Sequence, residues 1–220
     1  MKRAFFFSFV AGLALVAAAA AVYPLPKHER YLSSIEVLTN GGRREDFFIH
    51  WPQDRVRLPA VPDGLQALAG QTAFLLASGQ QAVMAELFRL RDVSGNVIGL
   101  AARISGQAGQ ANVTRSDWLL LVPSRGSLLL SQQDSSDLGP VRLAGQWRLP
   151  AETARFWGRA RSRRISAGPL PGGRGRVLRG TGEFRRLAGS YSETWELQEV
   201  LADGGTRGRI HLSTITEARR

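Results

Sequence analysis

The sequence predicts an all-β protein, folded as an antiparallel closed or nearly closed barrel of about eight to ten strands. Short segments with alternating polar and apolar residues recur along most of the chain, and this period of two is the pattern of a half-buried strand. Glycine and proline, 24 and 10 of the 220 residues, gather where these segments meet. Consecutive segments are joined by short turns, which predicts a meander. A meander of this many strands removes its exposed edges by closing.

The amino terminus predicts export from the cytoplasm. Lys2 and Arg3 precede an uncharged and mostly apolar run, residues 4–26, which is typical of a signal peptide. About 20 apolar residues are also enough for a membrane-spanning helix, so a cleaved signal and a retained anchor both remain open. We therefore divide the chain into residues 1–26, a signal peptide or membrane anchor helix, and residues 27–220, a single β-barrel domain. We expect this domain in the cell envelope, on the periplasmic side of a bacterial inner membrane, anchored by residues 4–26 or released after cleavage.

The individual elements follow from the alternation and from the turn residues between segments. Asn40-Gly41-Gly42 predicts the first hairpin, because these residues adopt the positive φ angles that tight turns need. Pro150 suits the first turn of a helix and predicts one short helix over residues 151–161, followed by a loop over residues 162–174. The expected strands span residues 34–38, 45–51, 72–77, 83–92, 97–105, 117–122, 127–131, 141–149, 175–187, 190–201 and 206–215.

One stretch near the end of the chain carries a family resemblance. Gly180-Thr-Gly-x-Phe184, followed by Gly189-Ser-Tyr191 and a further strand, resembles the allene oxide cyclase and dirigent protein superfamily of small barrels. The resemblance runs from Arg179 to Ile215 and implies an eight-stranded antiparallel barrel with an apolar interior. It also implies a cavity that guides a reactive intermediate by shape, with few catalytic side chains. The export segment and the arginine-rich loop depart from the family pattern, and the family's catalytic positions have no match in this chain.

Two carboxylates are expected to point into the barrel. On segment 190–201, Glu193 shares a face with Tyr191 and Trp195, and on segment 83–92, Glu86 shares a face with Phe88. A carboxylate in an apolar interior has a raised pKa unless it is paired, so Glu193 and Glu86 are the catalytic candidates. Together with the three aromatic residues they are the predicted ligand-binding residues. The alternative is a structural role, in which each carboxylate pairs with an inward arginine such as Arg103 or lies at a wet rim.

Several classes of chemistry find no support in the sequence. The chain has no cysteine, so disulfides, thiol nucleophiles and cysteine metal sites are excluded. His28, His50 and His211 lack the spacing of metal ligands, and we predict no metal and no cofactor. Nucleophile-elbow, phosphate-loop and dinucleotide motifs are absent as well.

Arginine dominates the charge of the protein. The formal net charge is +11, and 27 of the 29 basic residues are arginine. One region combines arginines with aromatic residues and predicts contact with an anionic lipid surface. The predicted contact residues are Arg155, Arg159, Arg161, Arg163, Arg164, Arg174 and Arg176. A solvated, functionless arginine surface is the alternative, and export argues against nucleic acid as a partner.

These observations lead to one main hypothesis and two alternatives. The main hypothesis is an extracytoplasmic, non-catalytic barrel that binds a lipid-like, apolar or amphipathic small molecule. The first alternative is an isomerase or cyclase similar to allene oxide cyclase, assisted by Glu193 or Glu86. The second is a non-enzymatic envelope protein that contacts anionic lipid or a protein partner. The sequence does not predict an oligomeric state.

Overall fold

The computed structural model describes residues 33–39, 41–56, 66–67, 73–78, 81–108, 113–135, 159, 161–201 and 206–218. All of them belong to the compact unit Tyr31–Arg220. The described strands are β1 (Ile35–Val37), β2 (Arg43–Trp51), β3 (Gln66–Ala67), β4 (Ala73–Ser78), β5 (Gln81–Arg91), β6 (Val97–Ala108), β7 (Val113–Val122), β8 (Gly126–Asp134), β9 (Ser162–Arg164), β10 (Ser166–Gly168), β11 (Gly175–Gly180), β12 (Leu187–Val200) and β13 (Thr206–Ala218). A 3-10 turn, η3 (Gly182–Phe184), lies between β11 and β12.

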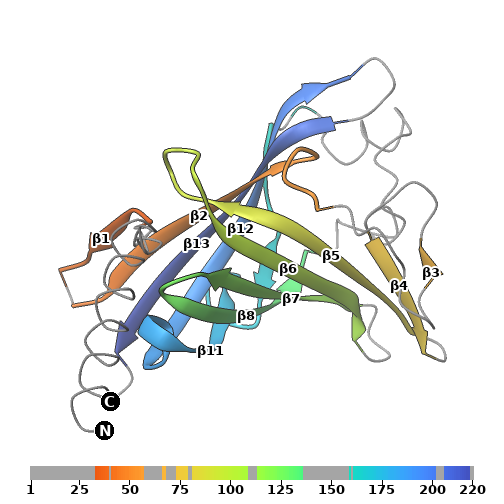
Figure 1. Cartoon of the computed structure of the whole chain (residues 1–220). Helices are drawn as coiled ribbons and strands as arrows, with labels where there is room; N and C mark the ends of the chain where they lie inside the picture. The colour runs from red at the N-terminus through yellow and green to blue at the C-terminus, as the bar shows by residue number, and fades with distance from the viewer. Residues whose placement is uncertain are drawn as a thin grey trace, which may run out of the picture. The chain divides into compact units, whose positions relative to one another are not determined.

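Eight of these strands form a closed antiparallel barrel. The order around the ring is β2, β13, β12, β11, β8, β7, β6 and β5, and β5 pairs again with β2. In Figure 1 the ring can be followed from β2 in orange, through β13 and β12 in blue, to the green and yellow strands β8 to β5. The prediction of an all-β, closed antiparallel barrel is confirmed.

An ion pair holds the seam where the ring closes. Strand β2 meets β5 at a single residue pair, Phe48 with Arg91. Arg55, just beyond the end of β2, forms a further bridge with Phe88 of β5. Asp54, in the turn after β2, is fully buried and accepts hydrogen bonds from Nε and Nη2 of Arg91 at 2.8 and 2.6 Å. The backbone N–H of His50 donates to the same carboxylate at 2.7 Å. The guanidinium of Arg91 and the carboxylate of Asp54 thus form a bidentate ion pair, the strongest geometry for such a pair. This pair stabilises the seam, where few backbone hydrogen bonds join the two strands.

Two short strands complete the ring beside β11. Strand β11 pairs with residues 128–131 of β8 and with residues 189–191 of β12. Beyond that point, β10 pairs with the end of β8, and β9 pairs with residues 194–196 of β12. The sequence predicted a loop over residues 162–174, and this was wrong for the part that forms β9 and β10. These strands have only three residues each, too few for alternation to be recognised.

The glycine motif that carries the family resemblance forms a turn at one end of the barrel. Strand β11 ends at Gly180, so the predicted strand over residues 175–187 was too long. Gly182 has φ +57°, and a Cβ there would collide with the carbonyl oxygen of Arg125. The turn brings Phe184 into a buried position, with its ring centroid 4.8 Å from the guanidinium carbon of Arg125. Arg125 is itself buried and paired with Glu45, so the motif packs an aromatic ring on a buried ion pair.

The long strands alternate as the sequence predicted. On β12, Tyr191, Glu193 and Trp195 are buried, while the residues between them are partly exposed. On β13, Ile210 and Leu212 point inward in the same way. The side chains of an eight-stranded barrel nearly fill its interior. These inward residues therefore decide whether the interior is packed with apolar side chains, contains charged groups or has room for a small ligand.

Several predictions lie outside the described residues. These are the signal peptide or anchor helix over residues 1–26, the strand over residues 141–149 and most of the short helix over residues 151–161. In the part of the chain that the structure describes, no helix has the length and apolar character needed to cross a membrane.

Candidate functional site

A group of charged and polar side chains lies inside the barrel. We call it the interior polar cluster, and its members come from strands β5, β6, β7, β8 and β12. It consists of Glu86, Arg103, Ser116, Gln132, Asp134 and Glu193. All six point inward because each occupies the buried phase of its strand's alternation.

Glu193 is the most completely bonded member of the cluster. Its side chain has no exposed surface. One carboxylate oxygen, Oε2, accepts from Nε1 of Trp118 at 3.0 Å and from Nε2 of Gln132 at 2.6 Å. The other, Oε1, accepts from Nε1 of Trp195 at 2.6 Å. Three N–H donors therefore replace the hydrogen bonds to water that the carboxylate loses on burial.

Ser166, which lies outside the ring strands, helps to orient this carboxylate through Gln132. Ser166, at the start of β10, accepts from the backbone N–H of Glu193 at 2.7 Å and donates to Oε1 of Gln132 at 2.6 Å. That second bond fixes the amide of Gln132, so its NH₂ group faces Glu193 and Asp134. The short strand β10, which the sequence did not predict, thus helps to position Gln132 and Glu193.

Arg103 is the central cation of the cluster. Its side chain is 1% exposed, and its terminal nitrogens lie 3.8 Å from a carboxylate oxygen of each of Glu86, Asp134 and Glu193. Its guanidinium carbon lies 5.4 Å from the ring centroids of both Trp118 and Trp195. Arg103 is therefore held between aromatic faces and acidic oxygens, the two environments that stabilise a buried guanidinium best. Glu86 and Glu193 therefore both lie beside Arg103, which is the structural alternative to a catalytic role for these two carboxylates.

Glu86 lies nearer the edge of the interior. Its oxygen Oε1 accepts from Nη2 of Arg55 at 2.6 Å, and Arg55 is 23% exposed. The same guanidinium covers the ring of Phe88, with 5.8 Å between its central carbon and the ring centroid. Arg55 thus links a buried carboxylate to solvent, as the wet-rim alternative for Glu86 describes.

Asp134 is a buried acid of the cluster that the sequence pattern did not identify. Burial raises the pKa of Asp134 to about 7, the negative charge of Glu193 adds to this, and Arg103 opposes it. Its oxygens accept from Oγ of Ser116 at 2.6 Å and from Nε2 of Gln132 at 2.8 Å. The predicted strand stopped at Ser131, whereas β8 continues to Asp134. Extending the alternation of Leu128 and Leu130 by two steps would have placed Gln132 and Asp134 on the inner face.

The charges of the cluster balance when Asp134 carries a proton. Glu86 and Glu193 then face the two cations Arg103 and Arg55. Ionisation of Asp134 adds a third negative charge to this group. A buried acid that is half-protonated near neutral pH can exchange a proton or change its hydrogen-bonding role there.

Tyr191 adds a buried hydroxyl group to the interior of the barrel. The side chain is 1% exposed, and among the residues that the structure describes, its hydroxyl has no hydrogen-bond partner. Burial and the nearby charges of Glu193 and Asp134 raise the pKa of the phenol well above its usual value, so it stays protonated. Its ring packs on Gly175, where a Cβ would collide with the ring carbons. Gly175 therefore lets the phenol lie flat against β11.

The structure brings the five predicted ligand-binding residues together inside the barrel. Tyr191, Glu193, Trp195, Glu86 and Phe88 are all buried there. The described residues contain no group of histidine and acidic side chains that could hold a metal ion. Of the seven predicted surface arginines, Arg155 lies outside the described residues, Arg163 is partly buried, and the others, Arg159, Arg161, Arg164, Arg174 and Arg176, are exposed.

A comparison with solved structures finds a similar fold in a dirigent protein. The pterocarpan synthase dirigent protein GePTS1 matches with a TM-score of 0.40 and 11% sequence identity, over 87% of this chain and 90% of that chain. No protein-family model matches the chain. No curated protein matches it either.

Proposed function

We propose that the barrel binds a small apolar or amphipathic molecule in its interior, next to the interior polar cluster, without catalysing a reaction. The ligand carries at least one hydrogen-bonding group. The observation that carries the proposal is a set of buried polar atoms without a hydrogen-bond partner among the described residues: Oη of Tyr191, Oγ of Ser105 and Nε of Arg103. Unbonded polar atoms cost stability in a buried site, and a ligand that bonds to them recovers this cost.

The bonding of Glu193 favours binding over catalysis. A catalytic base needs a free lone pair directed at its substrate. Both oxygens of Glu193 already accept hydrogen bonds from indole and amide groups, and its side chain has no exposed surface. Glu86 is held similarly by Arg55. The isomerase alternative requires a substrate to reach a carboxylate that indole, amide or guanidinium groups already surround, whereas binding requires no contact with either carboxylate.

Two tryptophans provide a direct test of binding. Trp118 and Trp195 both donate to Glu193, so a ligand beside the cluster changes their surroundings. We expect organic extraction of the purified protein, followed by mass spectrometry, to release a lipid-like molecule. Adding it back to the extracted protein should change the tryptophan fluorescence in a saturable way. Extracts that repeatedly contain no such molecule would count against the proposal.

The Tyr191→Phe variant separates stability from binding. We expect the ligand-free variant to be more stable than the wild type by about 1 kcal/mol in the free energy of unfolding, because a buried, unbonded hydroxyl is removed. The same variant should bind the extracted ligand more weakly. Denaturant unfolding and fluorescence titration measure the two effects. Glu199→Gln, at an exposed ion pair with Arg207, is the matched control and should change neither. A Tyr191→Phe variant that is less stable than wild type would contradict this account.

The cellular location belongs to the same proposal. The support is the sequence of residues 1–26, a basic start followed by an apolar run. We place the barrel in the cell envelope, on the periplasmic side of the inner membrane. Fractionation of the native host with an antibody against the protein tests this, and recovery in the cytosolic fraction alone would refute it.

A further inference from the structure

We propose that a pocket on the outer surface of the barrel binds a phosphate group. The pocket has a volume of about 170 Å³. It is lined by Arg44, Arg174, Ser190, Tyr191, Ser192, Ser213 and Ile215. We call it the outer pocket. It is distinct from the interior polar cluster because Arg44, Ser190, Ser192, Ser213 and Ile215 occupy the outward phase of their strands, Arg174 lies in the turn before β11, and only Tyr191 reaches the pocket from the buried face.

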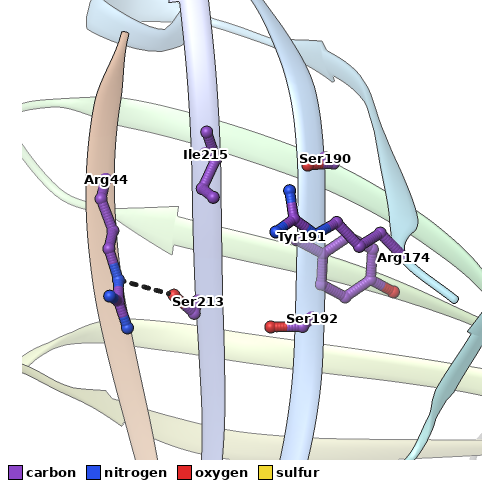
Figure 2. Close-up of a pocket in the computed structure, with 7 residues that line it drawn as sticks. All are labelled: Arg44, Arg174, Ser190, Tyr191, Ser192, Ser213 and Ile215. Carbon is purple, nitrogen blue, oxygen red and sulfur yellow. Dashed lines mark hydrogen bonds between the residues drawn. The ribbon is translucent and has the colours of Figure 1, made fainter. Parts of the chain in front are cut away.

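Strand register explains why a hollow forms here. Ser190 of β12 pairs with Ile215 of β13, which pairs with Arg44 of β2. In the next row, Ser192 pairs with Ser213. Three short side chains therefore lie side by side on two neighbouring strands, and they form a low floor between longer neighbours. Figure 2 shows this floor with Arg44 on one side and Arg174 on the other, while the ring of Tyr191 lies on the far side of β12.

The two arginines differ in how far they are already engaged. Nε of Arg44 donates to Oγ of Ser213 at 3.2 Å and lies 3.3 Å from Oδ2 of Asp46. Asp46 also bonds to Nε2 of His211 at 2.8 Å, so its charge is shared between two partners. Arg174 is exposed, and among the described residues no carboxylate pairs with its guanidinium. Figure 2 shows its side chain laid across β12 toward the serines.

Donor count and size favour a tetrahedral oxyanion. The pocket offers two guanidinium groups and the hydroxyls of Ser190 and Ser192, more donors than the two oxygens of a carboxylate can use. Guanidinium groups bind phosphate oxygens with paired, charge-assisted hydrogen bonds. The volume equals that of about five or six waters at ~30 Å³ each, which suits a phosphate or phosphate ester head group rather than a large apolar body. Arg176, the cross-strand neighbour of Ser190, adds a further positive charge nearby.

Inorganic phosphate is the first probe. We expect phosphate, titrated at constant ionic strength, to raise the thermal unfolding temperature of the full chain. Arg174→Gln and Arg44→Gln should each weaken phosphate binding about tenfold, because each removes charge-assisted hydrogen bonds. Arg161→Gln is the matched control, since Arg161 is exposed in the same arginine-rich region but does not line the pocket. Because no carboxylate of the described residues pairs with Arg174 and its side chain is exposed, its variant should fold normally.

A second arm separates a lipid head group from a soluble phosphate. Sedimentation with phosphatidylcholine vesicles, with and without phosphatidic acid, measures binding to a phosphomonoester on a membrane. The site is assigned to a lipid head group if vesicle binding requires phosphatidic acid, requires both arginines and is inhibited by free phosphate. If phosphate binding depends on both arginines but vesicles do not bind through them, the source is a soluble phosphate. No stabilisation by phosphate, or equal stabilisation in Arg174→Gln, Arg44→Gln and Arg161→Gln, would overturn the proposal.

Discussion

Arg103→Met should destabilise the barrel by about 3–5 kcal/mol in the free energy of unfolding, which is enough to unfold many domains of this size. Methionine fills a similar volume, so the loss comes from charge. Three buried carboxylates lose the cation that lies 3.8 Å from each of them. Denaturant unfolding followed by tryptophan fluorescence measures the effect, because Trp118 and Trp195 pack on this guanidinium.

A matched substitution separates burial from charge. Arg207 forms an exposed pair with Glu199 at 3.3 Å, so Arg207→Met should change the free energy of unfolding by less than about 0.5 kcal/mol. Adding Asp134→Asn to Arg103→Met should restore part of the lost stability, since one carboxylate less is left without its cation. A loss within 1 kcal/mol for Arg103→Met alone would show that the cluster does not depend on Arg103.

Stability should fall as the pH rises from about 4 to about 7, because of Asp134. Burial raises the pKa of this acid from 3.8 to about 7, so in this range the folded protein holds a proton that the unfolded chain has released. The contribution is fully present below pH 3.8 and is lost as the pH passes about 7. A pKa that rises from 3.8 to about 7 corresponds to up to ~4 kcal/mol in the free energy of unfolding.

Asp134→Asn removes the titrating group and should flatten this dependence. At pH 8 the variant should be more stable than the wild type, and at pH 4 the two should be similar. Unfolding curves at a series of pH values measure the difference. Asp117→Asn, at a partly exposed acid on β7, is the control and should leave the dependence unchanged. Asp46 has the opposite effect on the pH dependence. Burial alone would raise its pKa, but the hydrogen bonds from His211 and Ser213 lower it, so the stability that this carboxylate contributes is lost only at more acidic pH. A parallel pH profile for Asp134→Asn and the wild type would refute the assignment.

The alternation of residues was enough to predict the barrel and the inward direction of Glu193 and Glu86, although it was not followed far enough along β8 to include Asp134. Glu193 and Glu86 face the interior because each lies two residues from an aromatic side chain on the same strand face. The hydrogen-bond partners of these carboxylates depend on the register between strands that are distant in sequence. The residue pattern of one segment does not contain this register. Trp118 and Glu193, for example, are 75 residues apart.

The outer pocket could not be predicted for the same reason. Arg44 and Ser213 are 169 residues apart, and they meet only because β2 pairs with β13 when the ring closes. The sequence did identify Arg174 as a surface arginine, but it could not show that serines form a floor beside it. Closure of the barrel, rather than any local motif, creates both candidate sites.

Native mass spectrometry of the protein purified from its own host tests the central claim most directly, because it weighs each chain with whatever it holds inside. We expect the wild type to carry one additional small molecule per chain, which leaves on denaturation, and we expect lower occupancy in Tyr191→Phe. A wild-type mass equal to that of the bare chain in every preparation, with no change after organic extraction, would contradict the claim that the barrel interior is a binding site.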